Sequence, residues 1–159
     1  MKVYFSILAT ACALIFSASA HAAELESFER VRAKYREHRD PTRLSHLYNR
    51  CAALQLNVAA LLTRKGQKQG ANDYEQLAQH YMIMSETVER EIDVKRGAST
   101  KDVVKVVERA VANISDIYGL RFKENFNKRG EYLIGDALLE GELKECMLPD
   151  QFAKKALGK

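Results

Sequence analysis

Residues 40–62 read DPTRLSHLYNRCAALQLNVAALL, and this stretch decides the fold class of the chain. Its apolar residues recur at intervals of three and four positions, which places them on one face of an α-helix. They are Leu44, Leu47, Cys51, Leu54, Val58 and Leu61. Asp40 has the side chain of a helix cap, and Pro41 suits the first helical position. The stretch therefore predicts one long amphipathic helix, which ends at the glycines of residues 66–70.

The same periodicity continues through the rest of the chain. Further helices are expected from a capping box at Asn72 and Glu75 to Arg96, from a cap formed by Ser99 and Asp102 to Gly119 or on through Lys128, and from Tyr132 to Met147, with shorter ones near residues 25–35 and 150–157. No window shows the period of two that half-buried β-strands have. The sequence therefore predicts an all-α protein, a small antiparallel bundle of four to five helices.

The N-terminus has the layout of a secretory signal peptide. Lys2 precedes an apolar run from Val3 to Phe16, and small residues lead to an A-x-A cleavage site at residues 20–22, with cleavage after Ala20 as an alternative. A retained membrane anchor, which needs about 20 apolar residues, or a lipoprotein anchored through Cys12 would fit this pattern less well. We expect residues 1–22 to be removed, leaving residues 23–159 as one periplasmic or secreted domain without an integral membrane segment.

The remaining cysteines predict a disulfide. Removal of the signal peptide leaves two, Cys51 and Cys146, and paired cysteines in an exported protein are usually bonded. Each falls on the apolar stripe of its expected helix. A bond between them would close a loop worth roughly 4 to 5 kcal/mol in the chain-entropy model. Two free thiols, or a bridge between two copies of the chain, are the alternatives.

Charge argues against a nucleic-acid partner. The chain has 25 Lys and Arg residues, one of which lies in the expected signal peptide, against 21 Asp and Glu. This slight excess of positive charge is small for a nucleic-acid-binding protein. Two basic runs, residues 30–43 and 121–129, suit an anionic partner such as a phospholipid headgroup, a glycan phosphate or an acidic protein face. Solvated helix faces explain the same runs.

The candidate ligand-binding residues are Asp136, His80 and Tyr81. Asp136 falls between Tyr132 and Leu139 in the apolar stripe of the last long helix, where a carboxylate needs a partner. It is either a buried binding group or the edge of a slightly rotated helix. His80 and Tyr81 lie near methionines, a combination that suits haem or a metal in a helical bundle. The same residues at helical spacing also suit a plain hydrophobic core.

Common catalytic motifs do not occur in the sequence. There is no G-x-S-x-G, no S-x-x-K, no Gly-rich phosphate loop, and no H-E-x-x-H or C-x-x-C-H. Glu140 and Glu142 form a pair of carboxylates, which we expect on a polar, solvated helix face. The sequence therefore predicts no catalytic residue, no cofactor and no metal site.

These observations favour an exported helical protein that works by binding, as a non-enzymatic protein-binding, structural or stress-related module. The expected partner is another protein or a second copy of the chain. Aromatic side chains are available for such an interface at Tyr35, Tyr48, Phe122, Phe126 and Phe152. The alternative is a bundle that binds a small ligand, haem or a metal in a cavity lined by Asp136, His80 or Tyr81. An enzyme with a cleft joining His46 and Asp136 is a third alternative.

Overall fold

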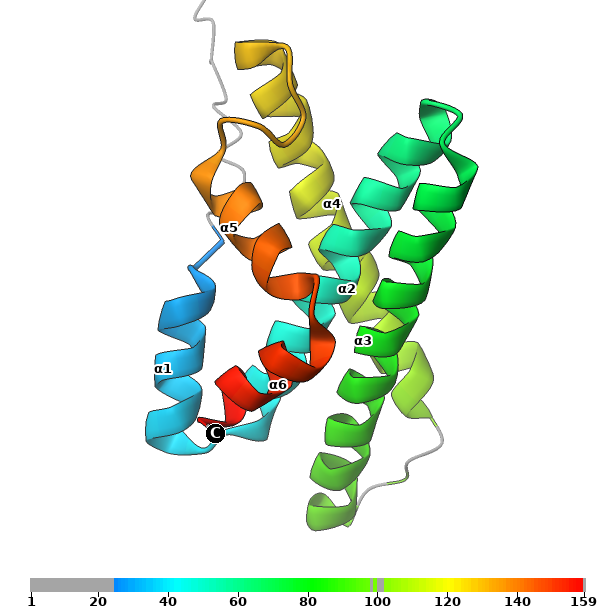
Figure 1. The fold of residues 1–159 in the computed structure, drawn as a ribbon. Helices are drawn as coiled ribbons and strands as arrows, with labels where there is room; N and C mark the ends of the chain where they lie inside the picture. The colour runs from blue at the N-terminus through cyan, green and yellow to red at the C-terminus, as the bar shows by residue number, and fades with distance from the viewer. Residues whose placement is uncertain (1–24, 98, 100–101, 159) are drawn as a thin grey trace, which may run out of the picture.

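The protein is all-helical in a computed structural model that describes residues 25–97, 99 and 102–158 (Figure 1). Its helices are α1 (Phe28–His38), α2 (Pro41–Arg64), α3 (Lys68–Arg96), α4 (Val103–Arg129), α5 (Ala137–Cys146) and α6 (Pro149–Leu157). The described residues form no strand, which confirms the expected fold class. The count in these residues is six instead of four to five, because both short terminal segments are helical.

The expected signal peptide and Cys12 lie outside the described residues. None of the described helices has both the length and the hydropathy that a membrane-spanning helix requires.

Helix α2 is the centre of the molecule. It packs against α3, which runs antiparallel to it, and against α4, which runs towards the same end as α2, and also against the short helices α1 and α5 (Figure 1). The predicted stripe is buried from Leu44 to Val58, and Leu61 is half-buried. The helix begins as expected, because the Asp40 carboxylate accepts a hydrogen bond from the Thr42 backbone N–H at 3.0 Å. Periodicity and capping therefore predicted this helix correctly.

Two helix boundaries differ from the sequence-based expectation. Helix α3 begins at Lys68, a full turn before the Asn72 capping box, because Gly70 lets its first turn approach Leu62 and Ala71 is buried there. Helix α4 does not end at Gly119 but continues to Arg129, the longer of the two expected ends. Packing of this last part against neighbouring elements outweighs the low helix propensity of a single glycine.

The last long helix begins five residues later than expected. Asp136 does not lie in an apolar stripe inside a helix; it is the N-cap of α5, and its carboxylate accepts hydrogen bonds from the backbone N–H groups of Leu138 and Leu139 at 3.1 and 3.2 Å. Gly135 precedes it with a φ of +83°, a conformation that side chains disfavour. The expectation failed because the spacing of Asp136 from Leu139 fits a helix interior and a helix cap equally well.

Four of the five aromatic residues expected at an interface are in the core instead. Phe152 of α6 contacts the rings of Phe28, Tyr48 and Tyr81, with centroid separations of 5.5 to 6.1 Å. Tyr35 and Phe122 are also buried. Aromatic packing therefore joins α6 to α1, α2 and α3. Phe126 alone of the five is exposed.

Candidate functional site around the Cys51–Cys146 disulfide

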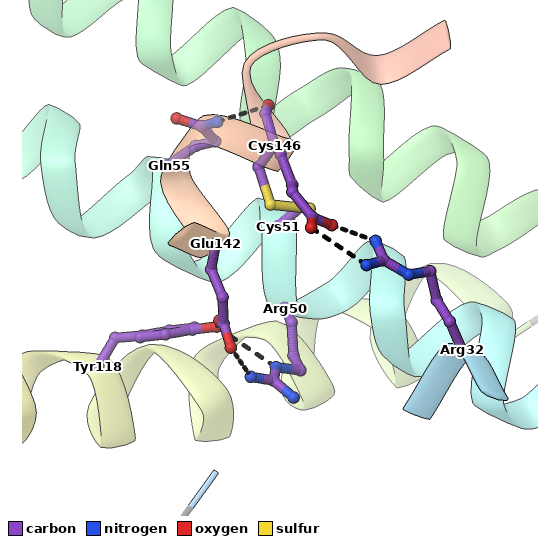
Figure 2. Close-up of a disulfide and its surroundings, with 8 residues drawn as sticks. Arg32, Arg50, Cys51, Gln55, Tyr118, Glu142 and Cys146 are labelled. Carbon is purple, nitrogen blue, oxygen red and sulfur yellow. Dashed lines mark hydrogen bonds and ion pairs between the residues drawn. A yellow bond between two sulfur atoms is a disulfide. The ribbon is translucent and has the colours of Figure 1, made fainter. Parts of the chain in front are cut away.

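The expected disulfide is present and joins α2 to α5. Cys51 and Cys146 are bonded, their Cα atoms are 5.4 Å apart, and neither residue has solvent exposure. Gln55 lies one turn beyond Cys51, and its side-chain amide donates a hydrogen bond of 2.8 Å to the backbone carbonyl of Cys146 (Figure 2). The covalent bond and the hydrogen bond together hold the C-terminal end of α5 against the middle of α2.

The residue next to Cys51 is Arg50, a fully buried cation. Its guanidinium donates hydrogen bonds to the Glu142 carboxylate and to the Tyr118 hydroxyl (Figure 2). It also donates one to the Glu26 backbone carbonyl. It also lies over the ring of Phe28, 4.5 Å from the centroid, in cation–π geometry. Arg50 therefore connects α2 to α1, α4 and α5 at one point.

The Glu142 carboxylate is buried, and the expectation that it lies on a solvated face is wrong. It accepts hydrogen bonds from Arg50 and from the Tyr118 hydroxyl. Burial raises its pKa to about 7, and the charge of Arg50 and the Tyr118 hydrogen bond oppose that shift. One signal in the sequence marks this residue: Glu142 lies four positions before Cys146, so it shares the inward face of α5.

A second ion-pair group flanks the disulfide on the other side. Glu145 pairs with the buried Arg32 of α1, with one of the two contacts at 3.1 Å, and with Lys155 of α6 at 3.0 Å. Burial raises the pKa of Glu145, but hydrogen bonds from Arg32 and Lys155 outweigh that effect and lower it overall. We refer to Arg50, Tyr118, Glu142, Arg32 and Glu145, together with the disulfide, as the α5 clamp.

The chemistry of the α5 clamp suits positioning and not bond making. Its cysteines are bonded to each other and buried, and each carboxylate is neutralised by a guanidinium. A buried pair of this kind is costly unless its geometry and remaining hydrogen bonds are satisfied, and here they are. Among the described residues no three His, Cys, Asp or Glu side chains are placed to share a metal ion. The clamp therefore fixes where α5 lies.

The three candidate ligand-binding residues of the sequence analysis lie in different surroundings. Asp136 forms a two-contact ion pair with Arg121 at 2.8 and 3.0 Å, which together with its helix-cap hydrogen bonds lowers its pKa against the effect of burial. Tyr81 is fully buried in the aromatic core, where desolvation raises the pKa of its hydroxyl. His80 is exposed, with its ring 6.4 Å from that of Tyr81. A polar hollow of about 440 Å³ includes Asp136 but neither His80 nor Tyr81 in its lining.

Three other hollows adjoin along the outer face of α5. One of about 440 Å³ lies between α5 and α6, and it shares Gly141 and Glu145 with one of about 330 Å³ between α5 and α1. The latter shares Ser27 and Leu138 with a third hollow of about 480 Å³ at the start of α1. We call the three together the α5 groove. Two residues of the clamp, Glu142 and Glu145, form part of its lining.

Gly141 lines two of the hollows and lies where they join. A Cβ atom added there would meet no atom within 4 Å, so the absence of a side chain leaves open space between two hollows. The residue lies inside a helix, where glycine costs about 1 kcal/mol relative to alanine. Only the placement of α1 and α6 on either side of α5 makes this glycine part of a groove.

Comparison of the chain with protein-family models, with curated protein sequences and with solved structures finds no match in any of the three.

Proposed function

We propose that this protein is an exported, non-enzymatic binding protein that holds an extended segment of another polypeptide in the α5 groove. The observation that carries the proposal is the continuity of the groove, whose three hollows share lining residues along one face of α5. A row of connected hollows suits an extended chain better than a compact ligand. In this proposal the partner binds in the groove, and not through the aromatic side chains that the sequence analysis expected at an interface.

The lining of the groove favours apolar side chains of the ligand. Leu148 and the edge of the buried Phe152 line the hollow between α5 and α6, and Leu138 and the edge of the buried Phe28 line the middle one. Pockets that bind ligands are mostly apolar, with a few polar groups that fix orientation. An extended segment that places apolar side chains into the hollows would cover the exposed Leu148 and the half-buried Leu138.

The polar groups at the α6 end favour a carboxylate on the ligand. Lys144 and Lys155 both line this hollow and both are exposed. Lys155 pairs with Glu145, whereas Lys144 makes no ion pair with any described residue. A carboxylate at the end of the bound segment would pair with Lys144, as in proteins that capture the C-terminus of a peptide.

Rigidity of the groove follows from the α5 clamp. Its floor is a ten-residue helix, which is too short to be stable alone in water. The disulfide and two buried ion pairs hold this helix in place, so a ligand would not bear the cost of ordering it. A disulfide also agrees with export, the other support for which is the signal-peptide pattern of residues 1–22.

The test selects peptides from a displayed random library by their binding to the disulfide-bonded protein. We expect the selected peptides to carry apolar residues and a free C-terminal carboxylate, and to bind more weakly when that carboxylate is amidated. Gly141→Trp should abolish binding, because the indole fills the space shared by two hollows. The matched control is Ala112→Trp at an exposed position of α4.

Two outcomes would overturn the proposal: peptides that bind Gly141→Trp as well as the wild type, or a library that yields no binder.

A second candidate is a small amphipathic carboxylate, because the hollow between α5 and α6 combines Phe152 and Leu148 with Lys144. Decanoate distinguishes the two. If decanoate binds and is blocked by Gly141→Trp while no peptide does so, the ligand is the small molecule.

A further inference from the structure

Two segments that do not line the α5 groove lie at the same end of the long helices, on opposite sides of that end in Figure 1. Helices α2 and α4 both run towards this end, so the turn between α2 and α3 and the connection between α4 and α5 both lie there (Figure 1). The second segment includes part of the basic and aromatic run at residues 121–129. We call the exposed residues of these two segments the basic end.

Positive charge collects at the basic end. Its exposed cations are Arg64, Lys65 and Lys68 at the first turn and Lys123, Lys128 and Arg129 at the second segment. None of the six forms an ion pair with a described residue. Acidic residues in the same stretches are limited to Glu124 and Glu131, and residues 62–69 contain none. Cations near helix C-termini are favourable in any protein, so charge alone does not identify a surface for a partner.

Exposed apolar side chains at the same end are the second, independent observation. Ile134 is 66% exposed and Phe126 is 42% exposed. The ring of Tyr132 stacks on that of Phe126 with a centroid separation of 4.5 Å, which holds the aromatic pair in place at the surface. Solvation of a helix end does not require such residues. Aromatic and aliphatic side chains surrounded by Lys and Arg are typical of surfaces that sit at a membrane interface.

We propose that the basic end docks on an anionic lipid bilayer, with Phe126 and Ile134 at the boundary of the acyl chains and the six cations at the headgroups. Lys and Arg side chains near an anionic leaflet are attracted to it, and the attraction falls with salt. This peripheral contact is separate from the α5 groove, whose lining comes from α1, α5 and α6 and from residues 25–27 and 148. A protein docked in this way would leave the groove free to bind.

The test is co-sedimentation of the protein with vesicles of phosphatidylcholine alone and of phosphatidylcholine mixed with phosphatidylglycerol. We expect binding to the mixed vesicles only, with a steep loss at high salt. Arg64→Glu combined with Lys65→Glu should lower the partition coefficient by more than about tenfold. Ile134→Ser should lower it several-fold without changing the salt dependence, because it removes an apolar contact and no charge.

Matched controls lie at the opposite end of the long helices. Lys95→Glu with Arg96→Glu makes the same change in net charge at exposed positions, and Val94→Ser removes an apolar side chain that is 68% exposed. We expect both to bind as the wild type does. Equal losses in the controls, or no binding to mixed vesicles, would overturn the proposal. Binding to heparin that is as tight as vesicle binding, with Ile134→Ser having no effect on either, would identify a general polyanion surface instead.

Discussion

Arg50 is fully buried and therefore places a strict requirement on its surroundings. A guanidinium cannot lose its proton to escape a buried site, so its charge and its N–H groups need partners wherever it lies. Glu142 supplies the charge, and acceptors on α4 and before α1 complete the set. Removing one partner of such a buried pair typically costs about 3–5 kcal/mol, whereas replacing both with apolar residues is often nearly neutral. The Arg50–Glu142 pair therefore specifies the positions of α2 and α5 relative to each other more than it adds to the free energy of unfolding.

At this scale the titration of Glu142 gives a prediction for the pH dependence of stability. Its pKa is about 7 in the folded protein, against an ordinary value of 4.5. Between these pH values the folded state binds more protons than the unfolded state, so the free energy of unfolding falls as pH rises from about 4.5 to about 7, by at most about 3 kcal/mol. Glu142→Gln should remove this slope in urea denaturation measured across that range.

Other titrating groups do not obscure the comparison. The pKa values of Asp136 and Glu145 are lowered, so their contributions are present above about pH 4.5 and are lost below it. His46 has a lowered pKa, mainly from desolvation, and so it makes stability rise with pH near its ordinary value of 6.5. That contribution is common to both proteins and cancels in their difference. If Glu142→Gln kept the wild-type slope, Glu142 would not be the titrating group.

At the scale of elements, α5 depends most on contacts with its neighbours. It has ten residues, begins at a cap made by Asp136, and is attached to α2 through Cys146 near its other end. Isolated helices shorter than about 12–15 residues are marginal in water. The α5 groove in turn depends on this helix, since α5 residues line each of its hollows. Residues of α1 and α6 form the opposite walls.

Removal of the disulfide should therefore affect α5 before the long helices. For Cys51→Ser with Cys146→Ser we expect a loss of about 2–5 kcal/mol in the free energy of unfolding. Backbone amides of α5 should lose hydrogen-exchange protection more than those of α2 and α3, because only ion pairs, hydrogen bonds and packing hold α5 in the variant. Amides of α5 that stay as protected as in the wild type would show that the ion pairs and hydrogen bonds suffice.

Helix termini were the elements that periodicity placed least well. The stripe at Tyr132, Leu139 and Leu143 was extended through Asp136, because a polar residue three positions before an apolar one fits both a cap and a helix interior. Arg121, which lies on α4, decides between the two by pairing with Asp136 outside the helix. In the same way, the start of α3 depends on the contact between Gly70 and Leu62 of α2. Both deciding contacts join residues on different helices.

In the described part of the molecule the long helices α2, α3 and α4 alternate in direction, α1 and α5 pack against α2, and α6 packs against α1, α3 and α5 (Figure 1). The disulfide closes a separation of 95 residues and so joins the early and late parts of the chain. Such a bond forms in an oxidising compartment and is uncommon in the cytosol. The disulfide is therefore consistent with folding of this protein outside the cytosol.

Intact mass of the protein purified from its producing cells tests export and the bond together. We expect a chain that begins at Ala23, or at His21 if cleavage follows Ala20, and a gain of about 2 Da on reduction, from the two hydrogens of one disulfide. The same sample would show any added lipid as extra mass. An uncleaved chain would contradict export, and a mass that does not change on reduction would show that Cys51 is a free thiol.

The sequence by itself determined the all-α class, most of the helices and the pairing of Cys51 with Cys146. Apolar spacing is a local property of each helix, and two cysteines allow one internal bond. Tertiary structure alone decided the burial of Arg50 and Glu142, the role of Asp136 as a cap, and the α5 groove at Gly141. The physical reason is that a ten-residue helix has too few turns to specify its own rotation. The disulfide and the buried charges of neighbouring helices set that rotation.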